Sequence, residues 1–154
     1  MSDAISLRDH IAAQMKEAMK SGEKTRVGAL RLIMSALKDR EIEARGAGKV
    51  VTRAEELALL TKMAKTRQES LTIYKDNGRD DLAAQEASEI AVINAFLPQQ
   101  MDDGAILEAA KAAIAEVGAA SVRYMGMVVA ALKEKYPGQM YFARASGVVK
   151  GLLG

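Results

Sequence analysis

Apolar residues recur at steps of three and four along most of the chain, and this spacing predicts amphipathic helices. The clearest case is a helical hairpin whose central stretch runs from Lys62 to Pro98. Its first arm should turn inward Leu57, Leu60, Ala64, Arg67, Leu71 and Tyr74. Its second arm should turn inward Leu82, Glu86, Glu89, Ile90, Ile93 and Leu97. The two faces can bury each other only if the chain reverses at Asn77-Gly78, where glycine allows a left-handed residue. Pro98 is expected to close the second arm.

Two further helices are predicted before the hairpin. The first begins at Ser6 and Asp9, which have the spacing of a capping box. Its expected buried face is Leu7, Ile11, Met15, Ala18 and Met19. The second covers about residues 24–45, with the expected buried face Val27, Leu30, Ile33, Met34, Leu37 and Ala44. Thr52 and Glu55 also have capping-box spacing, so the hairpin's first arm should begin there.

Three shorter helices are predicted after the hairpin. Asp102 or Asp103 should cap the first, which Gly118 ends, and the others cover about 122–136 and 142–153. Their expected buried faces are, in order, Leu107, Ala110, Ile114 and Val117; Met125, Val129 and Leu132; and Phe142, Ala145, Val149 and Leu152. The period-two alternation of strands is missing from the sequence. The predicted fold is therefore all-α, with an N-terminal four-helix domain over 1–98 and a three-helix domain over 99–154.

Composition agrees with a helical core and narrows the function. Apolar residues make up 49% of the chain and aromatic residues only 4%. The 22 basic and 20 acidic residues give a net charge of +2, which does not indicate a strong polyanion-binding protein. Any RNA binding would therefore need a local basic patch. The sequence has no cysteine, which excludes disulfides and zinc–thiolate sites. Charges within MSDAISLRDH argue against a signal peptide, and no apolar run reaches the ~20 residues of a membrane span, so a cytoplasmic protein is expected.

The sequence offers no catalytic, metal or cofactor site. Its only histidine, His10, stands beside Asp9 and an apolar face, as surface or boundary histidines do. Phosphate-binding glycine motifs do not occur. Catalysis by this chain is therefore not predicted.

Three charged residues interrupt the inward faces of the hairpin. Arg67 lies on the first arm, and Glu86 and Glu89 lie on the second. We predict an ion pair between the arms that fixes their register, because an unpaired charge there would cost several kcal/mol. The alternative is that the two glutamates act as a catalytic carboxylate pair, which would need a cleft and a substrate.

Basic residues recur every seven positions along the second helix, at Lys24, Arg31, Lys38 and Arg45. Such a line could follow the phosphates of a nucleic acid. The favoured interpretation is that these residues flank a buried face with their stems packed and their charges in water. Asp39, Glu41 and Glu43 are interleaved with them and dilute the positive potential.

The last fifty residues contain candidates for RNA contact. They are Arg123, Tyr124, Gly126, Lys133, Lys135, Arg144 and Lys150. Basic side chains could bind phosphates, and Tyr124, Tyr136 and Tyr141 could stack on bases. Gly126, early in a helix, fits the close approach of a neighbouring backbone. The competing interpretation is an ordinary set of solvated helix faces.

The run TRQESLTIYKDNGRDDLAAQEASEIAVINAFLPQQM resembles the signature of the free-standing GatB/YqeY family. RVGALRLIMSALKDREI and VRYMGMVVAALK fit the same family. The positions that match its pattern in the first run are Arg67, Ser70, Gly78, Arg79, Asp81, Leu82, Glu86, Glu89, Ile90, Leu97 and Pro98. The resemblance implies two helical domains, the second similar to the C-terminal tail of the GatB subunit of tRNA-dependent amidotransferases.

That tail is implied to hold tRNA while Glu-tRNA or Asp-tRNA is amidated with glutamine nitrogen. The resemblance thus implies a non-catalytic partner of tRNA or of a tRNA-handling complex. The family's label, carbon–nitrogen ligase activity with glutamine as amido-N-donor, would describe the complex it serves. The tail motif D-M-G-K-V-M is altered here, since Tyr124 and Met127 replace its acid and lysine, and Tyr141 replaces a later acid. The alternative function is a protein–protein adaptor that docks through an apolar face of the C-terminal helices.

Overall fold

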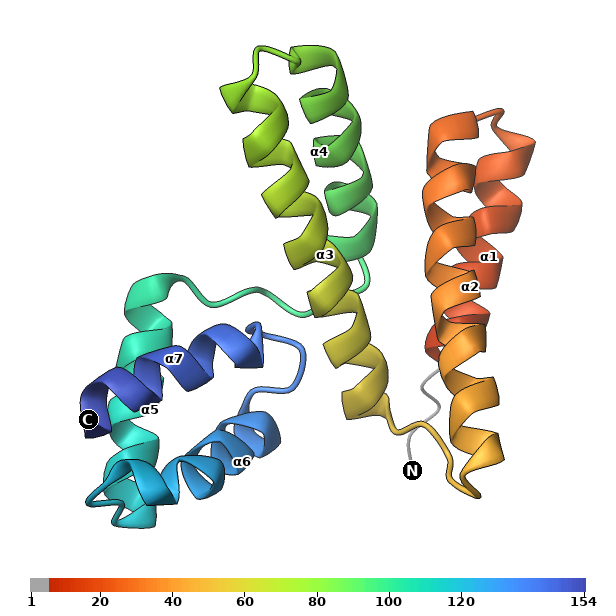
Figure 1. The fold of residues 1–154 in the computed structure, drawn as a ribbon. Helices are drawn as coiled ribbons and strands as arrows, with labels where there is room; N and C mark the ends of the chain where they lie inside the picture. The colour runs from red at the N-terminus through yellow and green to blue at the C-terminus, as the bar shows by residue number, and fades with distance from the viewer. Residues whose placement is uncertain (1–5) are drawn as a thin grey trace. The chain divides into compact units, whose positions relative to one another are not determined.

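A computed structural model describes residues 6–154, and the regular secondary structure of this part of the chain is entirely helical (Figure 1). The elements are α1 Leu7–Lys20, α2 Lys24–Gly46, α3 Arg53–Asp76, α4 Asp80–Asn94, α5 Asp103–Val117, the 3₁₀ helix η1 Val122–Tyr124, α6 Met125–Lys135 and α7 Phe142–Leu153. The all-α fold class is confirmed. The chain divides into two compact units, Met1–Phe96 and Leu97–Gly154, called here the N-terminal and C-terminal units. That each unit acts as a separate domain stays a prediction.

The reversal between α3 and α4 lies where the sequence predicts it. Asn77 caps α3, and its side chain donates a hydrogen bond to the Ile73 carbonyl at 2.7 Å. Gly78 follows with φ +70°, a left-handed conformation that glycine adopts without strain. The Arg79 N–H then donates to the Tyr74 carbonyl at 2.8 Å and closes the turn. As a result α3 and α4 lie side by side as an antiparallel pair (Figure 1).

The end of α4 differs from the prediction. Helix α4 ends at Asn94, with Ala95 as its C-cap, so it stops four residues before Pro98 and does not reach Leu97. The Phe96 N–H donates to the Ile93 carbonyl at 3.0 Å, and this tight last turn leaves Phe96 only 8% exposed. The helix therefore ends at the residue whose carbonyl would clash with the Pro98 ring if the helix continued, and the tight turn after it places Phe96 in the core.

The core of the N-terminal unit is formed by all four of its helices. Ser6 caps α1, as predicted, by accepting a hydrogen bond from the Asp9 N–H at 3.1 Å. The buried residues of the unit are Leu7, Ile11, Ala18, Val27, Ala29, Leu30, Ile33, Leu37, Leu57, Leu60, Thr61, Ala83, Ile93 and Phe96. Ala18 is fully buried, as expected, but Met19 is 57% exposed. Adjacent residues point about 100° apart on a helix, so both could not face the core equally.

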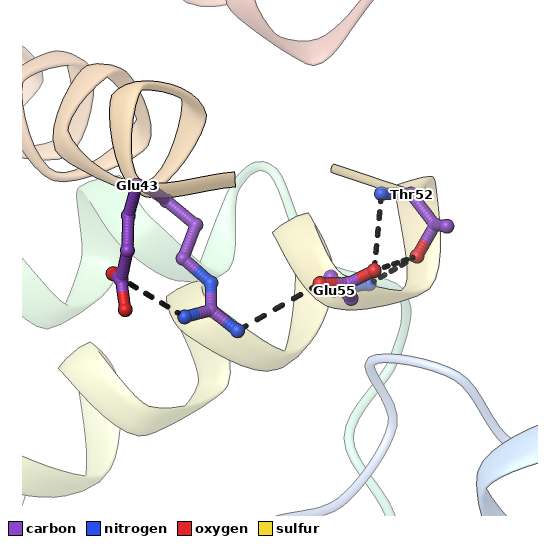
Figure 2. Close-up of polar contacts among 4 residues, drawn as sticks. Glu43, Thr52 and Glu55 are labelled. Carbon is purple, nitrogen blue, oxygen red and sulfur yellow. Dashed lines mark hydrogen bonds and ion pairs between the residues drawn. The ribbon is translucent and has the colours of Figure 1, made fainter. Parts of the chain in front are cut away.

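The start of α3 carries the predicted capping box (Figure 2). The Thr52 hydroxyl accepts from the Glu55 N–H at 3.1 Å, and the Glu55 carboxylate accepts from the Thr52 N–H at 3.4 Å. Arg40, near the end of α2, lies 3.7 Å from Glu55 and 3.6 Å from Glu43. The cap thus also joins the C-terminal part of α2 to the beginning of α3.

Replacing Thr52 by alanine is expected to lower the free energy of unfolding by about 1 kcal/mol, since the Glu55 N–H loses its acceptor. Urea unfolding followed by circular dichroism measures the change. Thr52→Ser keeps a hydroxyl and should stay close to the parent. Thr66→Ala is the matched control, because the Thr66 hydroxyl only bonds the Lys62 carbonyl within α3. A Thr52→Ala variant as stable as the parent would contradict the capping role.

The C-terminal unit has a core rich in alanine. Its buried residues are Ile106, Ala109, Ala110, Ala113, Val128, Leu132, Met140, Ala145 and Val149. Four of these nine side chains are alanines, so the three helices can approach one another closely. Asp102, not Asp103, caps α5 by accepting from the Ala105 N–H at 2.8 Å. Gly118 ends α5 with φ +74°, as predicted.

Two buried faces of this unit are rotated from those predicted. Leu107 was expected inside but is 36% exposed, and Ile106 is buried in its place. Val128 is fully buried, whereas Val129 is only partly so. Leu152, also expected inside, is 40% exposed. The second helix also starts later than predicted, because Val122–Tyr124 forms the separate 3₁₀ helix η1.

Candidate functional site

The structure brings the three charged residues of the hairpin together in one cluster, called here the Arg67 cluster. Arg67 extends from α3 and hydrogen-bonds the Glu89 carboxylate of α4. Its Nη1 atom also lies 3.7 Å from Oε1 of Glu86. The side chains of Arg67, Glu86 and Glu89 are 21%, 16% and 13% exposed. One guanidinium thus lies between two largely buried carboxylates at the interface of the two helices.

A cavity of about 370 Å³ borders this cluster. Its lining is Leu59, Lys62, Met63, Thr66, Arg67, Ser70 and Glu86. Ser70 is the only lining residue whose hydroxyl is not already bonded within the helix, but no histidine lines the cavity to activate it. His10 lies elsewhere, on α1, where its ring packs edge-on against Phe96 with centroids 5.0 Å apart. The cluster has the geometry of a structural ion pair, and its role in fixing register stays a prediction.

Residues 6–154 show neither a metal-binding cluster nor a membrane-spanning helix. No group of three or more histidine, aspartate or glutamate side chains lies close enough together there to hold a metal ion. None of the helices in that part of the chain combines the length and the apolar character that crossing a bilayer requires.

The candidate RNA-contacting residues of the C-terminal unit lie on three elements. Arg123 and Tyr124 belong to η1, Gly126, Lys133 and Lys135 to α6, and Arg144 and Lys150 to α7. All seven are exposed. The Arg123 guanidinium lies 5.9 Å from the centre of the Tyr124 ring, a cation–π distance. The structure therefore joins Arg123 and Tyr124 directly, and it distributes the others over the unit's surface.

Two of these basic residues are neutralised by acids of α5. Lys135 lies 2.9 Å from Glu116, and this hydrogen bond and the carboxylate's charge raise the pKa of Lys135. Arg144 lies 2.7 Å from Asp103. Arg123, Lys133 and Lys150 take part in no ion pair within residues 6–154. The positive charge available to a polyanion is thus smaller than the sequence alone indicates.

Two other features differ from the prediction. Of the three tyrosines expected to stack on bases, only Tyr124 is well exposed, at 41%. Tyr136 packs partly against the core, and Tyr141 is half-buried at the N-cap of α7. A side chain added at Gly126 would meet no atom within 4 Å, so nothing in the unit approaches this glycine closely.

The basic residues of α2 keep more unpaired charge than the interleaved acids indicate from sequence. Lys24, Arg31, Lys38 and Arg45 are all exposed, and none is in an ion pair within the described part of the chain. Two of the interleaved acids are instead paired elsewhere. Glu41 lies 2.6 Å from Arg8 of α1, and Glu43 lies 3.6 Å from Arg40. No pattern of spacing reveals the first of these pairs, because its members are 33 residues apart.

These observations define a class of protein: an all-helical chain of two units with exposed basic side chains that lack acidic partners, within residues 6–154, on α2, η1, α6 and α7. The model of a family described as Yqey-like protein matches residues 8–153. The chain therefore belongs to the YqeY family, and the resemblance inferred from the sequence is confirmed.

Curated relatives of this chain are yeast proteins named "Altered inheritance of mitochondria protein 41, mitochondrial". The Candida glabrata protein is 34% identical over 88 residues, which cover 55% of this chain and 46% of that protein. The Saccharomyces cerevisiae protein is 30% identical over 99 residues, covering 62% of this chain and 49% of that protein. The chain thus spans about half the length of these relatives.

The expectation of a cytoplasmic protein is wrong on this comparison, since these relatives are mitochondrial by name. That expectation rested on the charges of the first ten residues and on the length of apolar runs, and neither property distinguishes the cytoplasm from the interior of an organelle. Part of the charged run used in that argument, residues 1–5, also lies outside the described residues.

Proposed function

We propose that this chain is a non-catalytic accessory protein that binds tRNA or a tRNA-handling amidotransferase complex. The main support is membership of the YqeY family over residues 8–153, because the resemblance to the GatB tail implies a tRNA-holding role for the C-terminal unit. Any carbon–nitrogen ligase activity with glutamine as amido-N-donor would then belong to the complex. The chain itself would position RNA or a partner subunit.

The RNA-contacting surface proposed for the C-terminal unit consists of Arg123, Tyr124, Lys133 and Lys150. These side chains are exposed, and the three basic ones lack acidic partners within residues 6–154. Tyr124 can stack on an unpaired base while Arg123 binds a neighbouring phosphate, since the two side chains are already in cation–π contact. Lys135 and Arg144 contribute little, because Glu116 and Asp103 neutralise them.

A protein–protein adaptor is the second candidate, and exposed apolar side chains favour it. Val122, Met127 and Leu152 are 39%, 58% and 40% exposed on the C-terminal unit. Met127 occupies the position of the tail motif's lysine, so a basic side chain is replaced there by a flexible apolar one. Such a surface would dock against an apolar groove of a partner, with little dependence on salt.

A mobility-shift titration with total tRNA at 50 and 200 mM salt tests the proposal. Three phosphate contacts to single-stranded regions predict that log K falls with log salt with a slope of about −2. The Arg123→Gln, Lys133→Gln, Lys150→Gln variant should lose most of that slope. A charge-neutral control, Lys135→Gln with Glu116→Gln, should bind like the parent. If the full chain does not shift tRNA even at 50 mM salt, the RNA proposal fails and the adaptor is favoured.

A further inference from the structure

We propose that α2 carries a second RNA-binding surface, which contacts the phosphate backbone of double-stranded RNA. The surface, called here the α2 basic face, consists of Lys24, Arg31, Lys38 and Arg45. It lies in the N-terminal unit, whereas the proposed function rests on the C-terminal unit. The inference shares with that function only the assumption that the ligand is RNA.

The geometry of α2 aligns these four side chains. They are seven residues apart, so their Cα atoms are separated by about 10.5 Å along the helix and drift by about 20° per step. The four positions therefore extend over about 31 Å on one side of a continuous helix. All four side chains are exposed, and their helix is unbroken from Lys24 to Gly46. Such a row of cations on one side of a helix can follow a row of phosphates.

The structure removes the main objection to such a surface, which is dilution by interleaved acids. Glu41 is three residues after Lys38 and four before Arg45, so it would neutralise both from the same side of the helix. It is instead paired with Arg8 of α1 at 2.6 Å. Glu43 lies 3.6 Å from Arg40, which also contacts Glu55. Asp39 is thus the only acid of α2 without an ion pair among the described residues, against four such bases.

In two of the three gaps between the bases a small residue leaves room for a backbone, and the third gap holds the exposed Ile42. Gly28 and Ser35 lie on the same side of α2, between successive basic positions, and both are exposed. A side chain added at Gly28 would meet nothing within 4 Å, so a phosphate could approach the helix closely there. Shallow grooves flank Gly28 on both sides, one of about 470 Å³ reaching Met19 and one of about 670 Å³ reaching Ser88. The larger groove is also lined by Asp81 and Glu89, whose charges are paired with Arg79 and Arg67. The Ser35 hydroxyl can add a hydrogen bond to a phosphate oxygen.

The same face favours a duplex over a single strand. Proteins that bind single strands stack bases on aromatic side chains, and residues 24–46 contain no aromatic residue. Recognition of double-stranded RNA depends mainly on shape and on phosphate contacts, for which a row of lysine and arginine suffices.

An anionic membrane is the competing ligand for a basic helix, and packing argues against it. A helix that lies in a membrane must insert an apolar face. The apolar face of α2 is occupied, because Leu30, Ile33 and Leu37 are at most 2% exposed in the unit's core. Only Leu32 and Ile42 remain as large exposed apolar residues on this helix. The structure therefore assigns the α2 basic face to RNA.

The test compares binding of the full-length chain to a blunt RNA duplex of about 16 base pairs, a length that a small shape-reading domain covers. Four contacts predict a slope of log K against log salt of about −3.6, or about a 10²-fold loss of affinity between 50 and 200 mM salt. Replacing all four basic residues by glutamine should abolish most of this slope and weaken binding about 10²-fold at 50 mM. Glutamine has a helix propensity close to that of lysine and arginine, so α2 should still form, which circular dichroism checks.

A matched control removes the same charge from other faces of the unit, by glutamine at Lys16, Lys20, Arg53 and Lys75, which are exposed residues of α1 and α3. This control should bind the duplex within about fivefold of the parent, since only the long-range potential changes. Equal losses in both variants would overturn the proposal, because binding would then depend on net charge alone. So would retention of the parent by vesicles containing anionic phospholipid with no shift of the duplex.

The two RNA proposals can fail separately. If the Arg123→Gln, Lys133→Gln, Lys150→Gln variant loses tRNA while the α2 variant binds the duplex normally, the α2 basic face is excluded and the proposed function stands. If the α2 variant loses the duplex while the Arg123→Gln, Lys133→Gln, Lys150→Gln variant binds tRNA like the parent, the α2 basic face is supported and the C-terminal surface is excluded.

Discussion

Replacing Arg67 by methionine is expected to lower the free energy of unfolding of the N-terminal unit by about 2–4 kcal/mol at neutral pH. The substitution keeps most of the apolar stem but removes the guanidinium between Glu86 and Glu89. These carboxylates are only 16% and 13% exposed, so two neighbouring negative charges of α4 would lose their common partner. Little water could reach them to solvate the charges instead. The loss should be at the lower end of values for fully buried pairs, because some solvent still reaches both groups. Urea unfolding followed by circular dichroism measures it.

A variant in which both partners are also neutral separates pairing from packing. Arg67→Met with Glu86→Gln and Glu89→Gln leaves no unpaired charge, and it should recover much of the lost stability. Lys62→Met is a matched control on α3, since Lys62 is exposed at the edge of the same cavity. That control should change stability by less than about 0.5 kcal/mol. An Arg67→Met variant within this range of the parent would contradict the ion pair's structural role.

Features that depend on neighbouring residues could be predicted from the sequence. The caps at Ser6 and Thr52 use hydrogen bonds that span three residues, so residue type and spacing identify them. The turns at Gly78 and Gly118 both need a positive φ, which restricts the residue to glycine or, less often, asparagine. The position of the Arg67 cluster was predictable for a related reason, because charged residues within an inward face must be paired.

The faces of the C-terminal helices were harder to predict, because alanine gives a weak hydrophobic signal. In α5, Ile106 and Leu107 are adjacent, and either could begin an apolar face with the alanines that follow. The structure buries Ile106 together with Ala109, Ala110 and Ala113, which form the narrow side of the helix. Close approach of the neighbouring helices along this narrow side decides the rotation, and that choice depends on tertiary packing.

Charge pairing was the part of the candidate sites that could not be predicted. Lys135 and Glu116 are 19 residues apart, and Arg8 and Glu41 are 33 apart. The first pair removes a base from the C-terminal surface, and the second removes an acid from α2. From the sequence, the C-terminal unit is therefore the favoured site for RNA binding. In the structure, pairing leaves fewer free bases on that unit and fewer free acids beside the α2 basic face.

The second large effect is expected in the C-terminal unit. Leu132→Ala should unfold most of residues 97–154 at 25 °C while leaving the N-terminal unit folded. Leu132 is fully buried, and truncating such a leucine costs about 2–5 kcal/mol. A unit of this size, with four alanines among nine core residues, has only about 3–5 kcal/mol of stability to lose. The N-terminal unit keeps its own core and should not be affected.

Hydrogen exchange read by mass spectrometry distinguishes the two units within the full chain. In Leu132→Ala, amides of α5, α6 and α7 should exchange close to the unfolded rate, and those of α1 to α4 should keep their protection. Leu107→Ala is the matched control, because the same atoms are removed from a side chain that is 36% exposed in the same unit. It should cost less than about 1 kcal/mol and leave the protection of α5 nearly unchanged. Loss of protection in α3 and α4 in the Leu132 variant would mean that the two units unfold together, and the two-domain prediction would then be wrong.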